Sequence, residues 1–309
     1  MGDTTLAPVV IDTPGVYAIP DEVYHADPVP QGSLSSSGAR RLLPPSCPAL
    51  FRQWRADQRM TPSQTRGVAA HKRLLGVGPK IVVVDADDWR TNAARDQRDQ
   101  ALAAGHVPLL LKDYAQVREM ERQLRAHPDA GQLFAPRIGK VEQSLFWVDP
   151  EFGVWRRARL DLMLPGTPEH PMLVVDYKTT KAVDDASLSA TMANFGYHQQ
   201  GAWYLDAVEA LALTPPAGAV FLLVFQMATP PYLVRVKQPD PEAIQWGRVR
   251  NRAALDVYRT CTLTGQWPGY EPGVTSLSLP RWANRQLEAD WESGEYHIGE
   301  PNNDTEVIG

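Results

Sequence analysis

One short segment, Met172 to Tyr177, constrains the fold of this chain more than any other. It is almost wholly apolar up to Asp176, which is the composition of a strand buried on both faces in the middle of a sheet. Two stretches of alternating apolar and polar residues precede it, Val141–Val148 and Val154–Leu164, and the turn-rich sequence between them predicts a hairpin. We therefore expect a sheet with Met172–Tyr177 near its centre.

The segments after this strand complete the order β-β-β-α-β-β-α. Ser187–Leu213 and Pro241–Thr264 each predict one long helix, and Val220–Gln226 and Tyr232–Val236 predict strands. This order favours an α/β fold in which helices flank a mixed central sheet. Upstream, the Ser/Gly cluster over 33–38 predicts the start of a helix, and 81–84 predict a strand. Three further helices are expected: one over 49–60, one from about 65, and one over 113–127.

Composition limits the class of protein. The 309 residues are 43% hydrophobic and 22% charged, enough for one large domain or two small ones, and unlike a disordered chain. No apolar run approaches the roughly 18 residues that span a bilayer, and no secretory signal is recognisable. Two cysteines exclude a disulfide framework and a thiolate zinc or iron–sulfur site. A cytoplasmic protein without a membrane partner is expected.

Charge is unevenly distributed along the chain. The net charge is −5, which by itself argues against binding to DNA. The segment from Ser36 to Arg73, however, contains eight basic residues, Arg66 among them, and a single acidic residue, Asp57. Such a segment can neutralise phosphates, although a solvated helix face is an equally ordinary explanation. We expect a flexible N-terminus over 1–14, one domain over 15–283, and a disordered acidic tail over 284–309.

The chemistry is concentrated where the central strand ends, in Asp176-Tyr177-Lys178. Side chains two positions apart in a strand point to the same face, so Asp176 and Lys178 project together and Tyr177 points away. An aspartate can bind a hard cation, and a lysine beside it can orient or deprotonate a water or stabilise charge on a phosphate. By itself such a triplet is more often an exposed ion pair.

A second carboxylate, Asp161, ends the preceding hairpin. If the two strands are neighbours, Asp161 lies beside Asp176, and the repulsion between two carboxylates is relieved by a shared divalent cation. That cation would polarise a phosphodiester and lower the pKa of a bound water. The competing interpretation is an unrelated fold with a surface ion pair, in which Asp161 and Asp176 lie more than about 8 Å apart.

Four other residues raise the odds of a functional site. His71 is expected on a helix, one turn after Gly67, and Glu142 on the strand before Asp161, pointing away from its apolar neighbours. Gln200 and Tyr204 are four positions apart and therefore share a helix face. Each of these features alone is usually structural.

In order, these motifs resemble those of the RecB-like PD-(D/E)XK nucleases. The resemblance is strongest to the RecE-type exonuclease domain of exodeoxyribonuclease VIII and its phage relatives, and it extends in register from about residue 15 to 283. Further matching segments are 15–17, 21–25, 33–37, 48–51, 142–147, 197–200 and 275–283.

The resemblance implies a role for each matching residue. His71, Asp161, Asp176 and the Tyr177 carbonyl would bind a metal, with Glu142 as an additional acid at the metal or its water. Lys178 would position or activate the attacking water. Gln200 and Tyr204 would contact DNA or support the site, and we add Arg66 as a candidate DNA contact.

The resemblance also implies an activity. The expected reaction is Mg²⁺-dependent 5′–3′ degradation of linear double-stranded DNA, with Mn²⁺ able to substitute, which leaves 3′ single strands for recombination. The expected partners are DNA ends, a RecT-like single-strand annealing protein, and identical subunits in a ring such as a tetramer, in a bacterial host with a phage or prophage origin. Two alternatives stay open: an endonuclease of the same superfamily, and a non-catalytic DNA-binding or assembly module.

Overall fold

The computed structural model describes residues 9–56, 62–135 and 139–296. The chain divides into two compact units, Met1–Gly269 and Tyr270–Gly309, which are considered separately. The first unit contains the sheet and the candidate site. Among the described residues, no helix combines the length and the apolar composition that crossing a membrane requires.

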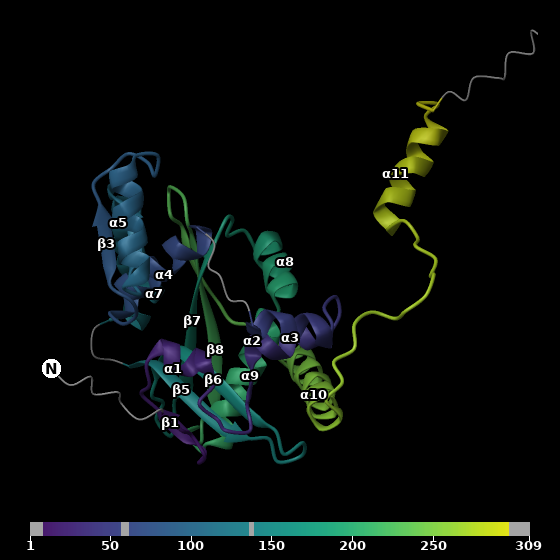
Figure 1. Cartoon of the computed structure of the whole chain (residues 1–309), viewed down its shortest axis with the longest axis horizontal. Helices are drawn as coiled ribbons and strands as arrows, with labels where there is room; N and C mark the ends of the chain where they lie inside the picture. Colours follow the sequence, from purple (N-terminus) through teal and green to yellow (C-terminus); the bar gives the residue numbers. More distant parts are fainter. Residues whose placement is uncertain (1–8, 57–61, 136–138, 297–309) are drawn as a thin grey trace, which may run out of the picture. The chain divides into compact units, whose positions relative to one another are not determined.

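A mixed sheet forms the centre of the first unit (Figure 1). Six strands follow one another across it: β1 (Gly15–Tyr17), β5 (Lys140–Val148), β6 (Trp155–Leu164), β7 (Met172–Thr180), β8 (Ala219–Met227) and β9 (Val234–Lys237). The short β2 (Leu34–Ser35) pairs with β6. The pairs β7–β8 and β2–β6 are parallel and the others antiparallel, so the expected hairpin and the mixed sheet are confirmed.

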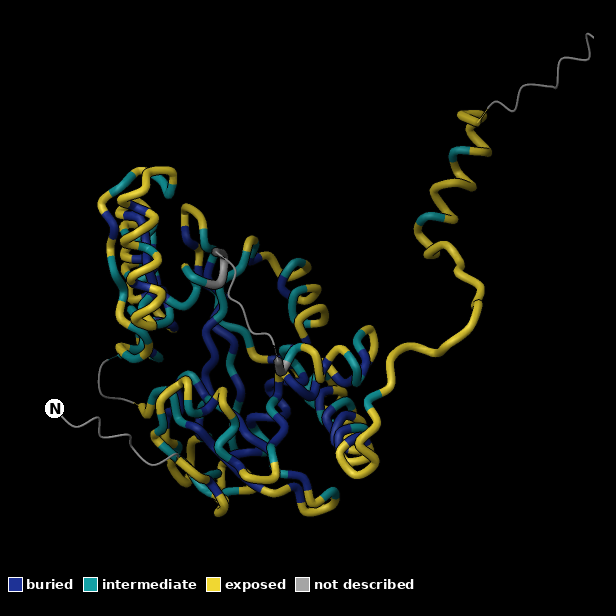
Figure 2. Tube along the Cα trace, in the orientation of Figure 1, coloured by how far each residue is buried: buried dark blue, intermediate teal, exposed yellow. Residues whose placement is uncertain are grey.

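Helices cover both faces of this sheet. Val174 and Phe221 face α2 (Ser36–Leu42), α3 (Pro48–Ala56), α9 (Tyr197–Ala210) and α10 (Pro241–Thr264). Val175 and Tyr177 face α4 (Pro62–Leu75), α6 (Leu111–Ala126) and α7 (Pro128–Leu133). Figure 2 shows that burial is greatest in the central strands, as expected for the apolar segment that ends at Asp176. The predicted α/β fold, in which helices flank a mixed central sheet, is therefore confirmed.

Smaller elements border the sheet. The helix α1 (Asp21–Ala26) supplies Tyr24 to a cluster with Phe146 of β5. The strand β3 (Ile81–Val84) pairs in parallel with β4 (Val107–Leu110), and α5 (Asn92–Ala103) connects them. The sequence predicts β3 but not β4, α5 or α7.

The single long helix expected over 187–213 is wrong. The segment forms two helices, α8 (Asp185–Phe195) and α9, and Gly196 separates them with a φ of 64°. This left-handed conformation favours glycine, and its N–H closes α8 by donating to the carbonyls of Met192 and Ala193. A Cβ at Gly196 would lie 2.7 Å from the Arg40 side chain, so the close packing also selects glycine.

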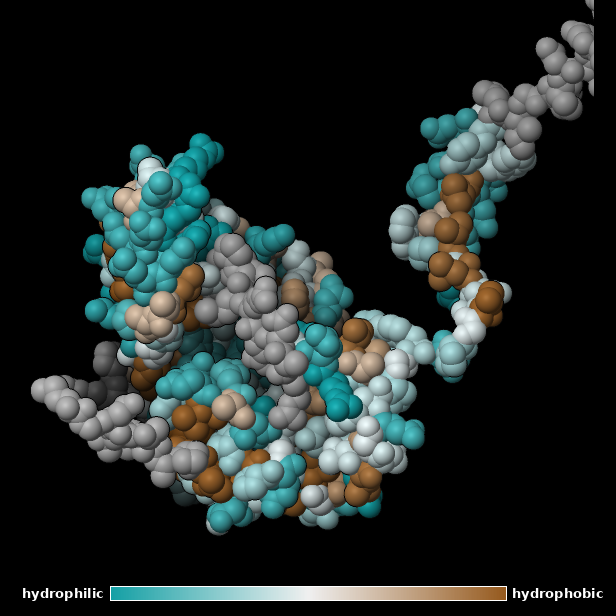
Figure 3. Space-filling view, in the orientation of Figure 1, coloured by the Kyte–Doolittle hydropathy of each residue, from teal (hydrophilic) through white to brown (hydrophobic). Residues whose placement is uncertain are grey.

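The chain termini also differ from expectation. Ile11 is buried in the apolar cluster that contains Tyr24 and Phe146, and its N–H donates to the Pro28 carbonyl. The segment expected to be a flexible N-terminus is therefore anchored at this residue. In the second unit, 281–292 form α11 (Arg281–Glu292), and the acidic tail expected from 284 therefore begins inside a helix. Its apolar side chains lie along one side, as Figure 3 shows. Residues 1–8 and 297–309 lie outside the described residues.

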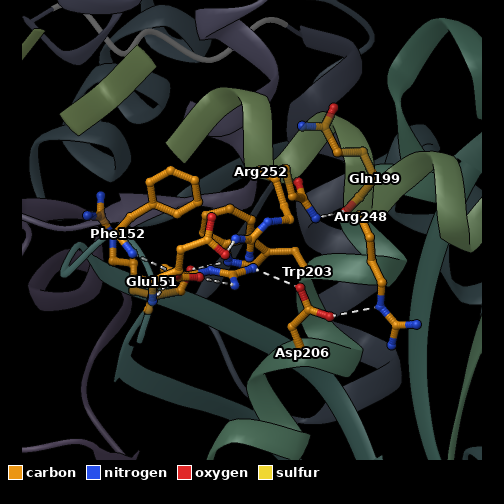
Figure 4. Close-up of polar contacts among 11 residues, drawn as sticks. Glu151, Phe152, Gln199, Trp203, Asp206, Arg248 and Arg252 are labelled. Atoms are coloured by element: carbon orange, nitrogen blue, oxygen red, sulfur yellow. Dashed lines mark hydrogen bonds and ion pairs between the residues drawn. The ribbon is translucent and has the colours of Figure 1, made fainter. Parts of the chain in front are cut away.

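A buried arginine joins the hairpin to α9 and α10. Arg156 of β6 lies over the rings of Trp147 and Trp203, and its guanidinium contacts Asp149 at 3.1 Å and Asp206 of α9 at 3.2 Å. Arg248 of α10 contacts the other oxygen of Asp206 (Figure 4). These contacts fix α9 against the sheet, and α9 carries two of the candidate site residues.

Candidate active site

Asp176 and Lys178 project from β7 toward α9, on the same face as Val174. Lys178 Nζ lies 2.6 Å from Asp176 Oδ2, and the Asp176 side chain is 1% exposed. Tyr177 points to the opposite face, where its hydroxyl donates to Gln226 at 2.7 Å. The alternation expected from the sequence is confirmed, and the pair is a buried ion pair rather than a solvated one.

Asp161 lies on the adjacent strand. Leu162 pairs with Val175, so Asp161 and Asp176 occupy the next position along β6 and β7. Asp161 Oδ2 accepts a hydrogen bond from the backbone N–H of Tyr177 at 2.9 Å. The carboxylate of one strand is thereby fixed directly to the residue between Asp176 and Lys178.

His71 of α4 connects two carboxylates. Its Nε2 lies 3.0 Å from Asp161 Oδ2, and its Nδ1 lies 3.2 Å from Glu142 Oε1. One ligand atom from each of these three residues lies within 4.8 Å of the others. Two carboxylates and an imidazole converging at this distance fit a divalent cation, which takes carboxylate oxygens readily and leaves its other positions to water or substrate.

Glu142 reaches this cluster from an unusual backbone conformation. The β5–β6 register places it opposite Asp161, between the pairs Val141–Leu162 and Gln143–Leu160. Its φ is 51°, in the left-handed region that is costly for a residue with a Cβ. Arg159 Nε donates to Glu142 Oε2 and holds the carboxylate on its other side.

Arg159 is a part of the site that the sequence patterns did not single out. Its Nη1 donates to Ser144 Oγ at 2.8 Å and to the Ile19 carbonyl at 3.0 Å, so the guanidinium is fixed while it holds Glu142. Arg159 precedes Asp161 by two positions in the same strand. Because side chains two positions apart in a strand share a face, the sequence could have predicted that Arg159 lies on the same side as Asp161.

The electrostatics of the cluster favour a proton on His71. Burial disfavours the imidazolium, but the charges of Asp161 and Glu142 outweigh burial and raise the pKa of His71 to about 9. Burial by itself would raise the pKa of Asp161, but the positive charges of His71 and Lys178 hold this pKa below the usual value. Burial raises the pKa of Asp176 to about 6, against the attraction of Lys178 and together with the charge of Asp161.

Gln200 and Tyr204 lie behind Asp176. Gln200 Nε2 donates to Asp176 Oδ1 at 2.8 Å and to the Tyr204 hydroxyl at 2.9 Å. Both side chains are buried. Their position favours support of Asp176, the second of the two roles expected for them, over contact with DNA.

The three-residue cluster differs from the expected ligand set. It contains Glu142 in place of Asp176, whose two oxygens contact Gln200 and Lys178. The backbone N–H of Tyr177, rather than its carbonyl, contacts the cluster. Arg66 lies on α4 outside the cluster, half-exposed, 3.6 Å from Asp113.

A cleft of about 1860 Å³ opens beside Glu142. Basic side chains outnumber acidic ones on its lining: Arg40, Arg41, Lys80, Arg159 and Arg250 against Asp21, Glu22 and Glu142. The cleft thus has a positive surplus although the chain as a whole is negative. This is the local charge that a phosphate backbone requires.

Comparison with known proteins identifies a family and a solved structure of the same fold. The family described as "PDDEXK-like domain of unknown function (DUF3799)" matches residues 92–273, more than half of the chain. A crystal structure of a protein from Eubacterium rectale, described as a "Putative exonuclease", shares the fold with a TM-score of 0.55 at 12% identity. The similarity covers 81% of this chain and 91% of that one. No curated protein matches the sequence.

The sheet, the paired carboxylates and the lysine at the end of β7 define a nuclease of the PD-(D/E)XK class. The enzymes of this class use a divalent metal, and the His71–Glu142–Asp161 cluster provides a place for one. Within the class, the chain belongs to the DUF3799 family of PDDEXK-like domains.

Proposed function

We propose that this protein is a Mg²⁺-dependent exonuclease that degrades linear double-stranded DNA from the 5′ end and leaves 3′ single-stranded tails. The observation that carries the proposal is the His71–Glu142–Asp161 cluster, joined through the Tyr177 N–H to Asp176 and Lys178, at the border of a basic cleft. The cluster supplies metal ligands, the lysine a cation at the reacting phosphate, and the cleft a path for the duplex.

Each residue of the site would make a different contribution to hydrolysis. His71, Glu142 and Asp161 would hold Mg²⁺ or Mn²⁺, which supplies polarisation of the phosphodiester and a more acidic bound water. Asp176 holds Lys178 by an ion pair, and Gln200 fixes Asp176 from behind. Lys178 orients the attacking water and stabilises the charge that develops on the phosphate, and the product carries a 5′-phosphate.

Polarity and partners extend the proposal beyond the site. The RecE-type motifs and the description of the Eubacterium rectale protein favour attack from DNA ends over internal cleavage. In the same setting, the 3′ tails would pass to a RecT-like annealing protein, and identical subunits would assemble as a ring around the duplex. Two free, buried cysteines are compatible with the cytoplasm as the place of action.

The experiment compares end-labelled linear duplex with a closed circle, with and without Mg²⁺. Wild type is expected to shorten the linear duplex from its 5′ ends only when Mg²⁺ is present, and to leave the circle intact. Lys178→Ala is expected to lower the rate by about 10²–10⁴-fold, the range for loss of a group that acts on the reacting proton or charge. Lys181→Ala, an exposed lysine three residues further along the chain, is the matched control.

Two results would contradict the proposal in different ways. Nicking of the closed circle would identify an endonuclease of the same class. Equal inactivity of wild type and Lys178→Ala on every form of DNA would favour a non-catalytic binding module.

A further inference from the structure

Phe195 is an exposed aromatic side chain at the wall of the cleft. It is the last residue of α8, and 59% of its surface is accessible to solvent. It lines the cleft that borders Glu142. An exposed phenylalanine is unremarkable by itself, but its support and its surroundings single this one out.

A second ring supports Phe195 from below. Tyr197 stacks against it with ring centroids 5.7 Å apart and ring planes 16° from parallel. Lys178 Nζ lies 5.1 Å from the centre of the Tyr197 ring. Because Tyr197 contacts both, the Phe195 ring lies no more than about 11 Å from Lys178 Nζ. At about 3.4 Å per nucleotide of a stacked strand, that is a distance of one to three nucleotides.

The backbone that carries Phe195 is fixed. Gly196 adopts the left-handed conformation that ends α8 and begins α9, and the Arg40 guanidinium donates to the Phe195 carbonyl. The Arg40 side chain also occupies the space that a Cβ at Gly196 would need. The ring is therefore presented from a rigid junction between two helices rather than from a mobile loop.

Charge on this wall of the cleft is uniformly positive. The parts of α2, α8, α9 and α10 that line the cleft contribute Arg40, Arg41 and Arg250 and no acidic side chain. A phosphate backbone would be neutralised beside an aromatic ring, which is the combination that proteins use to bind unpaired nucleotides.

We propose that Phe195 stacks on an unpaired base of the DNA strand whose phosphodiester reaches Lys178. This inference rests on the nuclease function proposed above and names a part of its substrate site. Tyr197 covers one face of the Phe195 ring, so a base would add a third ring to a stack that ends beside the reacting phosphate. The arrangement selects for DNA whose terminal base has left its partner, because a paired base inside a duplex presents no free face.

The test uses the full chain with Ca²⁺ in place of Mg²⁺, and DNA with the fluorescent base 2-aminopurine at successive positions from the 5′ end. Stacking on Phe195 is expected to quench one position within three nucleotides of the end. Phe195→Ala is expected to remove that quenching and to weaken binding of a single-stranded oligonucleotide by about tenfold. Phe195→Trp should retain both effects. Trp246→Ala removes an equally exposed aromatic outside the cleft and should change neither.

The outcomes separate this proposal from the nuclease function. Unchanged quenching and affinity in Phe195→Ala would overturn the stacking proposal, even if wild type digests DNA as expected. Position-specific quenching that Phe195→Ala abolishes and Phe195→Trp retains would support stacking, even if wild type hydrolyses no DNA. Equal loss in Phe195→Ala and Phe195→Trp would show a structural disturbance at the α8–α9 junction and would overturn the proposal.

Discussion

His71 favours a proton, which a metal bound at the proposed site would displace. Asp161 and Glu142 raise its pKa to about 9, whereas a metal ligand must be neutral imidazole. We expect the affinity for Mn²⁺ to rise about tenfold per pH unit between pH 7 and 8 and to level off above 9, as one proton is released for each ion bound. Calorimetric titration at several pH values in two buffers of different ionisation enthalpy measures both quantities.

The proton on His71 opposes metal binding but stabilises the folded, metal-free protein. In the metal-free protein the folded pKa of His71 lies above its ordinary value of 6.5, so its contacts stabilise fully below pH 6.5 and lose that contribution as pH rises through 9. His71→Asn serves as the control, because both the affinity slope and this part of the stability profile should flatten. A steep affinity slope in His71→Asn would exclude His71 as the titrating ligand.

Glu142 combines a position in the proposed metal site with a left-handed backbone. A residue with a Cβ costs about 1 kcal/mol more than glycine at a φ of 51°. We therefore expect Glu142→Gly to be about 1 kcal/mol more stable than Glu142→Ala, although both lose the carboxylate and bind metal equally weakly. Urea denaturation without metal compares the stabilities, and calorimetry compares the affinities. Equal stability of the two variants would show that the backbone at this position relaxes freely.

At the scale of elements, the position of α9 depends on the buried Arg156. Arg156→Ala removes a guanidinium that contacts Asp149 and Asp206, where the arginine and Asp149 side chains are 5% and 3% exposed. Removing the charged partner of the buried Asp149 carboxylate is expected to cost about 3–5 kcal/mol of unfolding free energy. Arg156→Met, which fills the space without charge, should cost less.

Arg248 provides a matched comparison for this prediction. It contacts the same Asp206 but is 42% exposed, so Arg248→Ala should cost less than about 1 kcal/mol. Guanidinium denaturation of the three variants checks the order. A loss in Arg248→Ala as large as that in Arg156→Ala would mean that the exposed pair, rather than the buried one, anchors α9.

The elements that sequence predicted best are those with one clear hydrophobic period. The helix α10 begins and ends at the expected residues, and the hairpin of β5 and β6 differs by a residue at each strand start. The break between α8 and α9 was missed because helical periodicity continues on both sides of Gly196. The left-handed backbone of Gly196 and the packing of Arg40 beside it distinguish a cap from a glycine inside a helix, and neither is a local sequence pattern. Short β4 carries only four residues and no alternation.

The site shows the same division between local pattern and three-dimensional contact. Strand alternation was enough to place Asp176 and Lys178 on one face. The hairpin was enough to suggest Asp161 beside Asp176, whereas metal-binding roles for His71 and Glu142 could be expected only from resemblance. The three residues of the cluster lie on three elements that meet through tertiary packing. The engagement of Asp176 by Gln200 follows from the packing of α9, which no local pattern records.

At the scale of the whole molecule, the sheet and the site lie within Met1–Gly269. None of the described residues from 270 to 296 is buried, and Trp267, just before this boundary, stacks on Phe51. We expect a chain that ends at Gly269 to unfold cooperatively, with a midpoint within about 2 °C of the full chain, because none of the described residues that it loses is buried.

Differential scanning calorimetry of the two chains, with circular dichroism as a second probe, tests this expectation. Mg²⁺-dependent digestion of linear duplex DNA should also be retained in the shorter chain. A broad, non-cooperative transition after truncation would show that 270–309 contribute to the core of the first unit.

The parallel pairing of β7 with β8 has a consequence for how the enzyme becomes active during folding. The two strands are joined only through α8 and α9, and Asp176 receives its hydrogen bond from Gln200 on that connection. Contacts between segments distant in sequence form slowly, because the intervening loop must first close. Catalytic competence would therefore be acquired late: a refolding chain regains its secondary structure first, and cleaves DNA only after the crossover has docked.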